Sequence, residues 1–152
     1  MFDFNLIEGL KYLLILLPSL TVHEWAHAQS ALWLGDDTAK RMGRCTLNPG
    51  AHVDIVGTIL LPLLRFPIGW AKPVPINPYN FSSTFSPRFG MMLSALAGPF
   101  SNVLLALASA AVLYIGQRTN LWIRVGGEPF NFLISVMYLN LVLAFFNLLP
   151  VP

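Results

Sequence analysis

Two histidines and a glutamate lie together in the sequence His23-Glu24-Trp25-Ala26-His27. On an α-helix, residues i and i+4 project from the same face one turn apart, so both imidazoles can bind one metal ion. Zinc bound in this way makes water acidic enough to lose a proton near neutral pH, and Glu24 can accept that proton. We predict that His23 and His27 are zinc ligands and that Glu24 is the general base. The alternative is a pair of structural histidines in a helix.

A third zinc ligand is needed, because a catalytic zinc normally has three protein ligands and one open position. The remaining histidine is His52, and Asp54 follows two residues later. Either residue could complete the site or could hydrogen-bond to a zinc-binding histidine. The alternative is a polar pair at a junction between a loop and the membrane. Cys45 is the only cysteine, which excludes a cysteine-based zinc site and an intrachain disulfide.

The segments that carry these residues are typical of a membrane protein. Hydrophobic residues make up 55% of the sequence and charged residues 11%, whereas about a quarter of an ordinary soluble domain is charged. Residues 89–117 and 129–152 contain no Asp, Glu, Lys or Arg. Each stretch exceeds the ~20 residues that a helix needs to cross the hydrocarbon layer. Ionisable groups inside a membrane are costly and usually functional, which favours a metal site over structural histidines.

The apolar segments predict an all-α membrane protein with three long transmembrane helices, over about residues 4–34, 87–116 and 130–149. The apolar run at 53–66 is short for a full crossing, so it predicts a re-entrant or tilted element, with a complete crossing as the alternative. Residues 67–80 contain prolines spaced so that no helix can persist. We expect a small extended or β segment there, near the membrane surface.

Basic residues predict the orientation in the membrane. If the N-terminus lies outside and residues 53–66 do not cross, six basic residues share one side: Lys40, Arg41, Arg44, Arg65, Lys72 and Arg88. The other side keeps Lys11, Arg118 and Arg124. We therefore predict that the first side is cytoplasmic and that the metal site lies nearer to it, since His23 is only roughly 16 Å from that end of its helix. The net charge of +2, without a basic run, excludes nucleic-acid binding.

Two further motifs lie on the predicted membrane helices. Residues 96–102 read LAGPFSN and residues 147–152 read NLLPVP. Together with HEWAH, LNPGAHVDIVGTILLP and GWAKPVPINPYNF, they resemble the compact prokaryotic branch of the site-2 protease family of intramembrane zinc metalloproteases. The resemblance covers nearly the whole chain, and its motifs occur in the expected order.

This resemblance implies a zinc endopeptidase of the prokaryotic plasma (inner) membrane, with one Zn²⁺ per chain. The enzyme would hydrolyse peptide bonds within or near transmembrane segments of other membrane proteins. The resemblance also implies that Asn102 lies near the catalytic centre and that Asn147 hydrogen-bonds the substrate backbone or the oxyanion. A buried Asn can donate to developing negative charge without adding a charge to the membrane. For Asn102, the alternative is a hydrogen bond between helices.

The family's last motif continues from Asn-x-x-Pro to Leu-Asp-Gly, whose Asp is the third zinc ligand. The sequence stops at Pro152, before such a motif. We therefore expect residues 1–152 to form a single membrane-embedded metalloprotease core that is incomplete at the C-terminus. The alternative is an inactive homologue that acts as a membrane metal-binding or scaffold protein. The expected partners are a membrane-protein substrate with a transmembrane helix and the lipid bilayer; the oligomeric state has no sequence signal.

Overall fold

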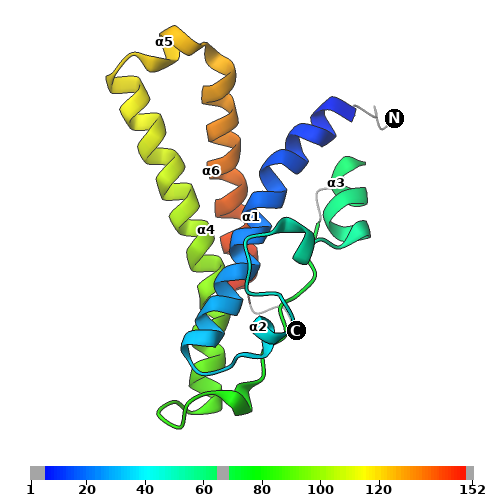
Figure 1. Ribbon diagram of the computed structural model, residues 1–152. Helices are drawn as coiled ribbons and strands as arrows, with labels where there is room; N and C mark the ends of the chain where they lie inside the picture. The colour runs from blue at the N-terminus through cyan, green and yellow to red at the C-terminus, as the bar shows by residue number, and fades with distance from the viewer. Residues whose placement is uncertain (1–5, 65–68, 150–152) are drawn as a thin grey trace. The chain divides into compact units, whose positions relative to one another are not determined.

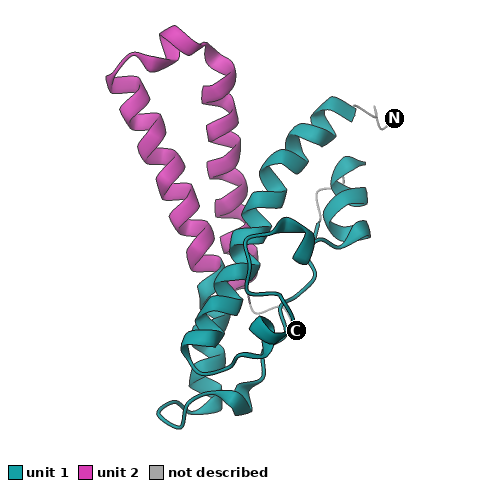
Figure 2. Cartoon of the chain, viewed as in Figure 1, with its two compact units in different colours: residues 1–98 teal, residues 99–152 magenta. Residues whose placement is uncertain are grey.

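A computed structural model of the chain describes residues 6–64 and 69–149. The chain divides into two compact units, residues 1–98 and residues 99–152, and the division falls within one long helix (Figure 2). We refer to them as unit 1 and unit 2 and describe each by itself. The predicted elements at 53–66 and 67–80, and the final NLLPVP motif, lie partly outside the described residues.

Three long helices dominate the described part of the chain: α1 (Leu6–Trp33), α4 (Pro87–Arg118) and α6 (Gly127–Leu148) (Figure 1). All three are long and apolar enough to cross a membrane. Their lengths of 28, 32 and 22 residues exceed the ~20 residues required. No strand occurs between residues 6 and 64 or between 69 and 149. The predicted all-α membrane fold is therefore confirmed.

Helix α1 contains Pro18 and nevertheless continues to Trp33. The Ser19 and Thr21 hydroxyls donate to backbone carbonyls four residues earlier, at 2.9 and 2.7 Å, which satisfies both hydroxyls inside an apolar helix. The helix ends before Gly35, whose φ of 111° is accessible to glycine at little cost. The end of α1 therefore agrees with the end predicted from the sequence.

Short helical elements fill most of residues 38–63. They are α2 (Thr38–Arg41), η1 (Pro49–Ala51), the π-helical η2 (Ile55–Leu60) and α3 (Leu61–Leu63). Elements η2 and α3 together extend at most about 14 Å, well short of the ~30 Å hydrocarbon layer. Element α3 packs closely on α1, because a Cβ atom at Gly9 would lie 2.7 Å from the Leu63 carbonyl oxygen.

Residues 69–77 form neither helix nor strand, and the short η3 (Pro78–Asn80) follows them. The missing helix agrees with the proline spacing. Beyond η3, Phe81 packs with Ala31 and Leu34 in a buried apolar cluster at the C-terminal end of α1. This cluster holds the segment that leads into α4 against the end of α1.

Unit 2 contains the rest of α4, the short α5 (Leu121–Val125) and α6. The Trp122 side chain lies over Gly116, where a Cβ atom would be 2.3 Å from the ring, and its Nε1 donates to the Leu113 carbonyl at 3.2 Å. Helix α6 begins three residues earlier than predicted, because the Pro129 ring is tolerated in a first helical turn. Helix α5 lies inside the predicted polar loop.

Candidate metal centre

The side chains of His23 and His27 meet on one face of α1. Their Nε2 atoms are 3.0 Å apart, and the two rings are nearly perpendicular, with an interplanar angle of 84°. Two nitrogens bound to one tetrahedral zinc at the usual distance would lie ~3.3 Å apart. The observed pair is close to that separation. The sequence prediction that both imidazoles point to one place is therefore matched by the geometry.

A backbone carbonyl in α4 fixes the ring orientation of His27. Its Nδ1 lies 2.7 Å from the carbonyl oxygen of Ser94. A carbonyl can only accept, so Nδ1 carries the hydrogen, and in a neutral imidazole Nε2 then holds the lone pair. Zinc-binding histidines commonly use a hydrogen bond of this kind to keep the other nitrogen aimed at the metal.

One turn after Ser94, Gly98 leaves space in front of the two ring nitrogens. A Cβ atom at this position would lie 2.3 Å from Nε2 of His27 and 2.7 Å from Nε2 of His23. Even the smallest side chain would therefore occupy the place at which both nitrogens point. The two donors, the tautomer and the glycine together fit a metal ion of the zinc type.

A third ligand is not supplied by the part of the chain that the structure describes, where no group of three His, Cys, Asp or Glu residues could hold a metal. His52 is buried, and its Nε2 lies 2.8 Å from the Thr46 carbonyl oxygen. Asp54 caps η2 by accepting hydrogen bonds from the next residues of the backbone. Neither residue joins His23 and His27 in such a group, so their role as ligands stays a prediction.

The ionisation of His52 is shifted by its surroundings. Burial lowers the pKa of this imidazole below its ordinary value. The hydrogen bond with the Thr46 carbonyl acts in the opposite direction, and the positive charge of Arg44 lowers the pKa further. His52 is therefore a neutral ring near pH 7 that hydrogen-bonds to the backbone of its own loop.

Glu24 follows His23 in the sequence, and its carboxylate is buried. It binds a backbone group from a segment far away in the sequence. Its Oε2 accepts a hydrogen bond from the Val74 N–H at 3.0 Å. The two carbonyls that directly precede Val74, those of Lys72 and Pro73, accept hydrogen bonds from Nη2 of Arg44. The bond to the Pro73 carbonyl is 3.2 Å long. These contacts of Arg44 and Val74 were not predicted from the sequence. The alternation of proline around Val74 is the one signal that could have indicated them.

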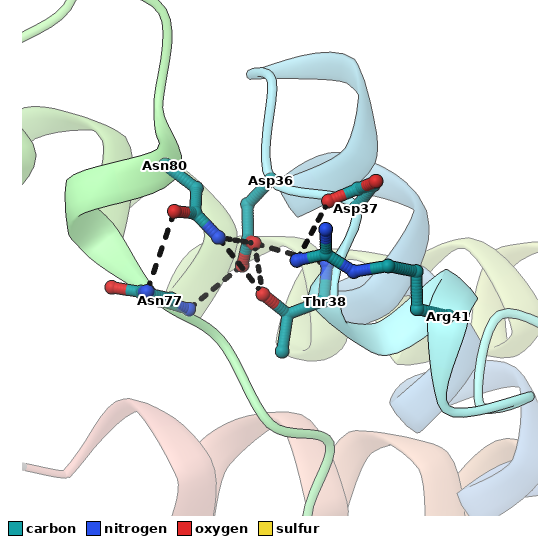
Figure 3. Close-up of polar contacts among 6 residues, drawn as sticks. All are labelled: Asp36, Asp37, Thr38, Arg41, Asn77 and Asn80. Atoms are coloured by element: carbon teal, nitrogen blue, oxygen red, sulfur yellow. Dashed lines mark hydrogen bonds and ion pairs between the residues drawn. The ribbon is translucent and has the colours of Figure 1, made fainter.

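Asp36 binds the C-terminal part of the proline-rich segment, residues 69–80 (Figure 3). The buried Asp36 carboxylate accepts hydrogen bonds from the Thr38 N–H and hydroxyl, the Asn77 N–H at 2.7 Å and the Asn80 side chain at 3.0 Å. Burial alone would raise the pKa of Asp36, but the hydrogen bonds outweigh it and hold the pKa below its ordinary value. Asp36 is thus an ionised anchor that joins the end of α1 to residues 77–80.

The two predicted substrate-binding asparagines lie in unit 2. Asn102 is fully buried and donates from Nδ2 to Oδ1 of Asn140 at 2.7 Å, and Asn140 donates to the Val136 carbonyl at 2.9 Å. This is the hydrogen bond between helices that was the alternative for Asn102. Asn147 is exposed and donates to the Leu143 carbonyl of its own helix at 2.8 Å. Substrate binding by Asn102 and Asn147 stays a prediction.

Asn140 was not predicted from the sequence as a partner of Asn102. The signal was a polar residue within the apolar run of α6, since polar side chains in membrane helices often hydrogen-bond across to another helix.

Comparison with known proteins gives relatives along nearly the whole chain. The chain is 44% identical over 148 residues to "Putative zinc metalloprotease YwhC" of Bacillus subtilis, a match that covers 94% of this chain and 64% of that protein. It is 31% identical over 139 residues to "Putative zinc metalloprotease Rip2" of Mycobacterium tuberculosis, covering 90% of this chain and 50% of that protein.

A further relative, Rip2 of Mycolicibacterium smegmatis, is 27% identical over 136 residues, which cover 90% of this chain and 50% of that protein. The chain thus spans between half and two thirds of the length of these curated relatives. No protein-family model matches the chain, and no solved structure gives a significant match.

Proposed function

This chain is related to proteins named as zinc metalloproteases, which supports its assignment to a site-2 protease-like family, and on that premise we propose that it is an intramembrane zinc endopeptidase. Its substrates would be other membrane proteins, cut within or near a transmembrane helix. The observation that carries the proposal is the His23–His27 pair, whose nitrogens lie 3.0 Å apart in front of Gly98 on a helix apolar enough to span a membrane.

In the proposed site, His23 and His27 would hold one zinc ion per chain, with Nε2 of each ring as the donor atom. Zinc, when bound, supplies Lewis-acid chemistry that makes water acidic near neutral pH. Glu24 is the group that takes the proton from water and passes it to the leaving amine. The Val74 N–H binds Oε2 of Glu24, and the carboxylate keeps further lone pairs that can accept this proton.

The apolar surroundings support an intramembrane location for this chemistry. Three helices of the described chain can cross a membrane, and His23, Glu24 and His27 lie within the first of them. We place the protein in a prokaryotic plasma membrane, with the site nearer the cytoplasmic side because basic residues favour that side for residues 36–51. A substrate helix would need to unwind there to expose a peptide bond.

The experiment compares the parent protein with Glu24→Gln and His27→Ala in detergent or bilayer nanodiscs. The probe is a single-span reporter helix with a Gly-Pro pair in its membrane segment. Glu24→Gln should retain bound zinc and lose cleavage by roughly 10²–10⁴-fold, because only the base is removed. His27→Ala should lose zinc as well. Cleavage by Glu24→Gln at the parent rate would contradict the proposal.

A second candidate function is favoured by one observation: the described residues supply two histidines and no third ligand group. A metal-binding membrane scaffold needs no hydrolytic site. It predicts that the parent protein binds zinc through His23 and His27, and that Glu24→Gln changes nothing in any assay.

A further inference from the structure

Four backbone groups of residues 72–74 form hydrogen bonds with residues elsewhere in unit 1. The Lys72 N–H donates to the His52 carbonyl at 2.9 Å, and the Lys72 carbonyl accepts from Arg44. The Pro73 carbonyl also accepts from Arg44, and the Val74 N–H donates to Glu24. A segment outside helices and strands has no repeating backbone hydrogen bonds of its own, so these contacts determine its position.

The prolines on either side make the Val74 donor unique. Proline has no backbone N–H, so Val74 provides the single backbone donor between Pro73 and Pro75. Both prolines also fix φ, which reduces the number of conformations that the segment can adopt. The one donor of this stretch is directed at the carboxylate that the proposed function makes the general base.

Arg44 is the side chain that fixes the backbone directly before this donor. Its exposed fraction is only 7%, and a buried guanidinium is stable only where acceptors meet it. Here the acceptors are two successive carbonyls, those of Lys72 and Pro73.

We propose that Arg44 is a positioning residue for Glu24, which acts by holding the Lys72 and Pro73 carbonyls so that the Val74 N–H binds Oε2 of Glu24. The inference rests on the proposed function, because only a general base at Glu24 would need to be held in position. The alternative is that Arg44 only anchors its loop, with no effect on Glu24. A readout on Val74 itself separates the two.

The first test measures hydrogen exchange of the Val74 amide by NMR, in metal-free protein labelled with ¹⁵N-valine. Arg44→Gln should speed this exchange by about tenfold or more, because the donor is no longer held on Glu24. Arg41→Gln is the matched control: Arg41 lies three residues before Arg44 at the end of α2, is 65% exposed and pairs with Asp37 at 3.1 Å. It should leave the exchange rate of Val74 unchanged.

The second test measures cleavage of the single-span reporter. Val74→Pro removes the donor without changing charge. Val74→Pro and Arg44→Gln should lower kcat by roughly 10–100-fold, with KM and bound zinc unchanged, because the base is displaced. Arg41→Gln should match the parent in kcat, and Arg44→Lys should recover part of the activity that Arg44→Gln loses.

The outcomes separate this inference from the proposed function. Unchanged exchange of Val74 in Arg44→Gln overturns the positioning role, whatever the cleavage rates are. Faster exchange with a parent-like kcat also overturns it, because Glu24 is then not positioned by this contact. Full cleavage by Glu24→Gln would instead overturn the proposed function. The exchange rate of Val74 would then decide only whether Arg44 holds the Val74 N–H on Glu24. Faster exchange together with a lower kcat supports the inference.

Discussion

Nδ1 of His27 lies 2.7 Å from the carbonyl oxygen of Ser94, so a side chain of α1 is bound to the backbone of α4 within unit 1. The Ser94 carbonyl thus orients the imidazole of His27. A ligand whose direction is already fixed loses less conformational freedom on metal binding. The same stretch of α4 also supplies Gly98, which keeps the space in front of the ring open.

Gly98→Ala should weaken zinc binding on the order of 10–100-fold, because its methyl group would lie within 2.3 Å of the His27 ring nitrogen. Zinc affinity can be measured by competition with a chromogenic chelator. Gly127→Ala is the control, since a Cβ atom there meets nothing within 4 Å. Equal zinc affinity in Gly98→Ala and the parent would show that the metal does not occupy this place.

Asp36→Asn should lower the free energy of unfolding by about 1–3 kcal/mol at pH 7, because buried donors lose their carboxylate partner. The folded-state pKa of Asp36 lies below its ordinary value of 3.8, so this stabilisation is present above pH 3.8 and is lost as pH falls toward the folded pKa. The difference between variant and parent should therefore shrink below about pH 4. Denaturant titrations followed by tryptophan fluorescence at several pH values measure it.

Asp37→Asn is the matched control for Asp36. Its carboxylate pairs with Arg41 at 3.1 Å, and both side chains are about half exposed or more. Exposed pairs contribute at most about 1 kcal/mol, so this variant should unfold nearly like the parent. If Asp37→Asn lowered the free energy of unfolding as much as Asp36→Asn, the buried Asp36 carboxylate would not be the more stabilising of the two.

Asn102→Ala and Asn140→Ala should be coupled in stability. In a double-mutant cycle, the coupling energy should be about 0.6 kcal/mol and at most about 1.7 kcal/mol, the range found for hydrogen bonds between membrane helices. Additive losses would mean that the bond at 2.7 Å contributes nothing. Cleavage of the reporter gives a second readout: a larger loss for Asn102→Ala than for Asn140→Ala would indicate a role of Asn102 toward substrate.

The loop around α2 should face the cytoplasm. Lys40 is exposed, so Lys40→Cys in a Cys45→Ser background should react with a membrane-impermeant maleimide only in inverted vesicles. Arg118→Cys in the same background should react in vesicles of the opposite orientation. Labelling of Lys40→Cys in right-side-out vesicles would reverse the proposed orientation of the site.

The long helices and the histidine pair could be predicted because each depends on local sequence. Charge-free apolar runs specify α4 and α6, and the four-residue spacing of His23 and His27 specifies their common face. These signals come from neighbouring residues of one helix. For the same reason, the start of α6 was predicted three residues late, since a proline is compatible with both a loop and a first helical turn.

The contacts that Glu24 and residues 36–52 make with residues 69–80 could not be predicted, because they join residues far apart in sequence. Glu24 and Val74 are 50 residues apart, and Asp36 and Asn77 are 41 apart. Neither pair follows a helical or strand period, so no pattern in the sequence marks them. The burial of Arg44 could not be predicted either, because in the sequence Arg44 is one of several basic residues in a polar stretch.

The Pro73-Val74-Pro75 stretch also specifies a register. If the chain slipped by one residue in either direction, a proline nitrogen would lie opposite the Glu24 carboxylate, and that nitrogen has no hydrogen to donate. An ordinary segment that slipped by one residue would still offer an N–H at this position, whereas here a slip of one residue removes the donor to Glu24. The two flanking prolines therefore disfavour both single-residue shifts of this segment against Glu24 of α1.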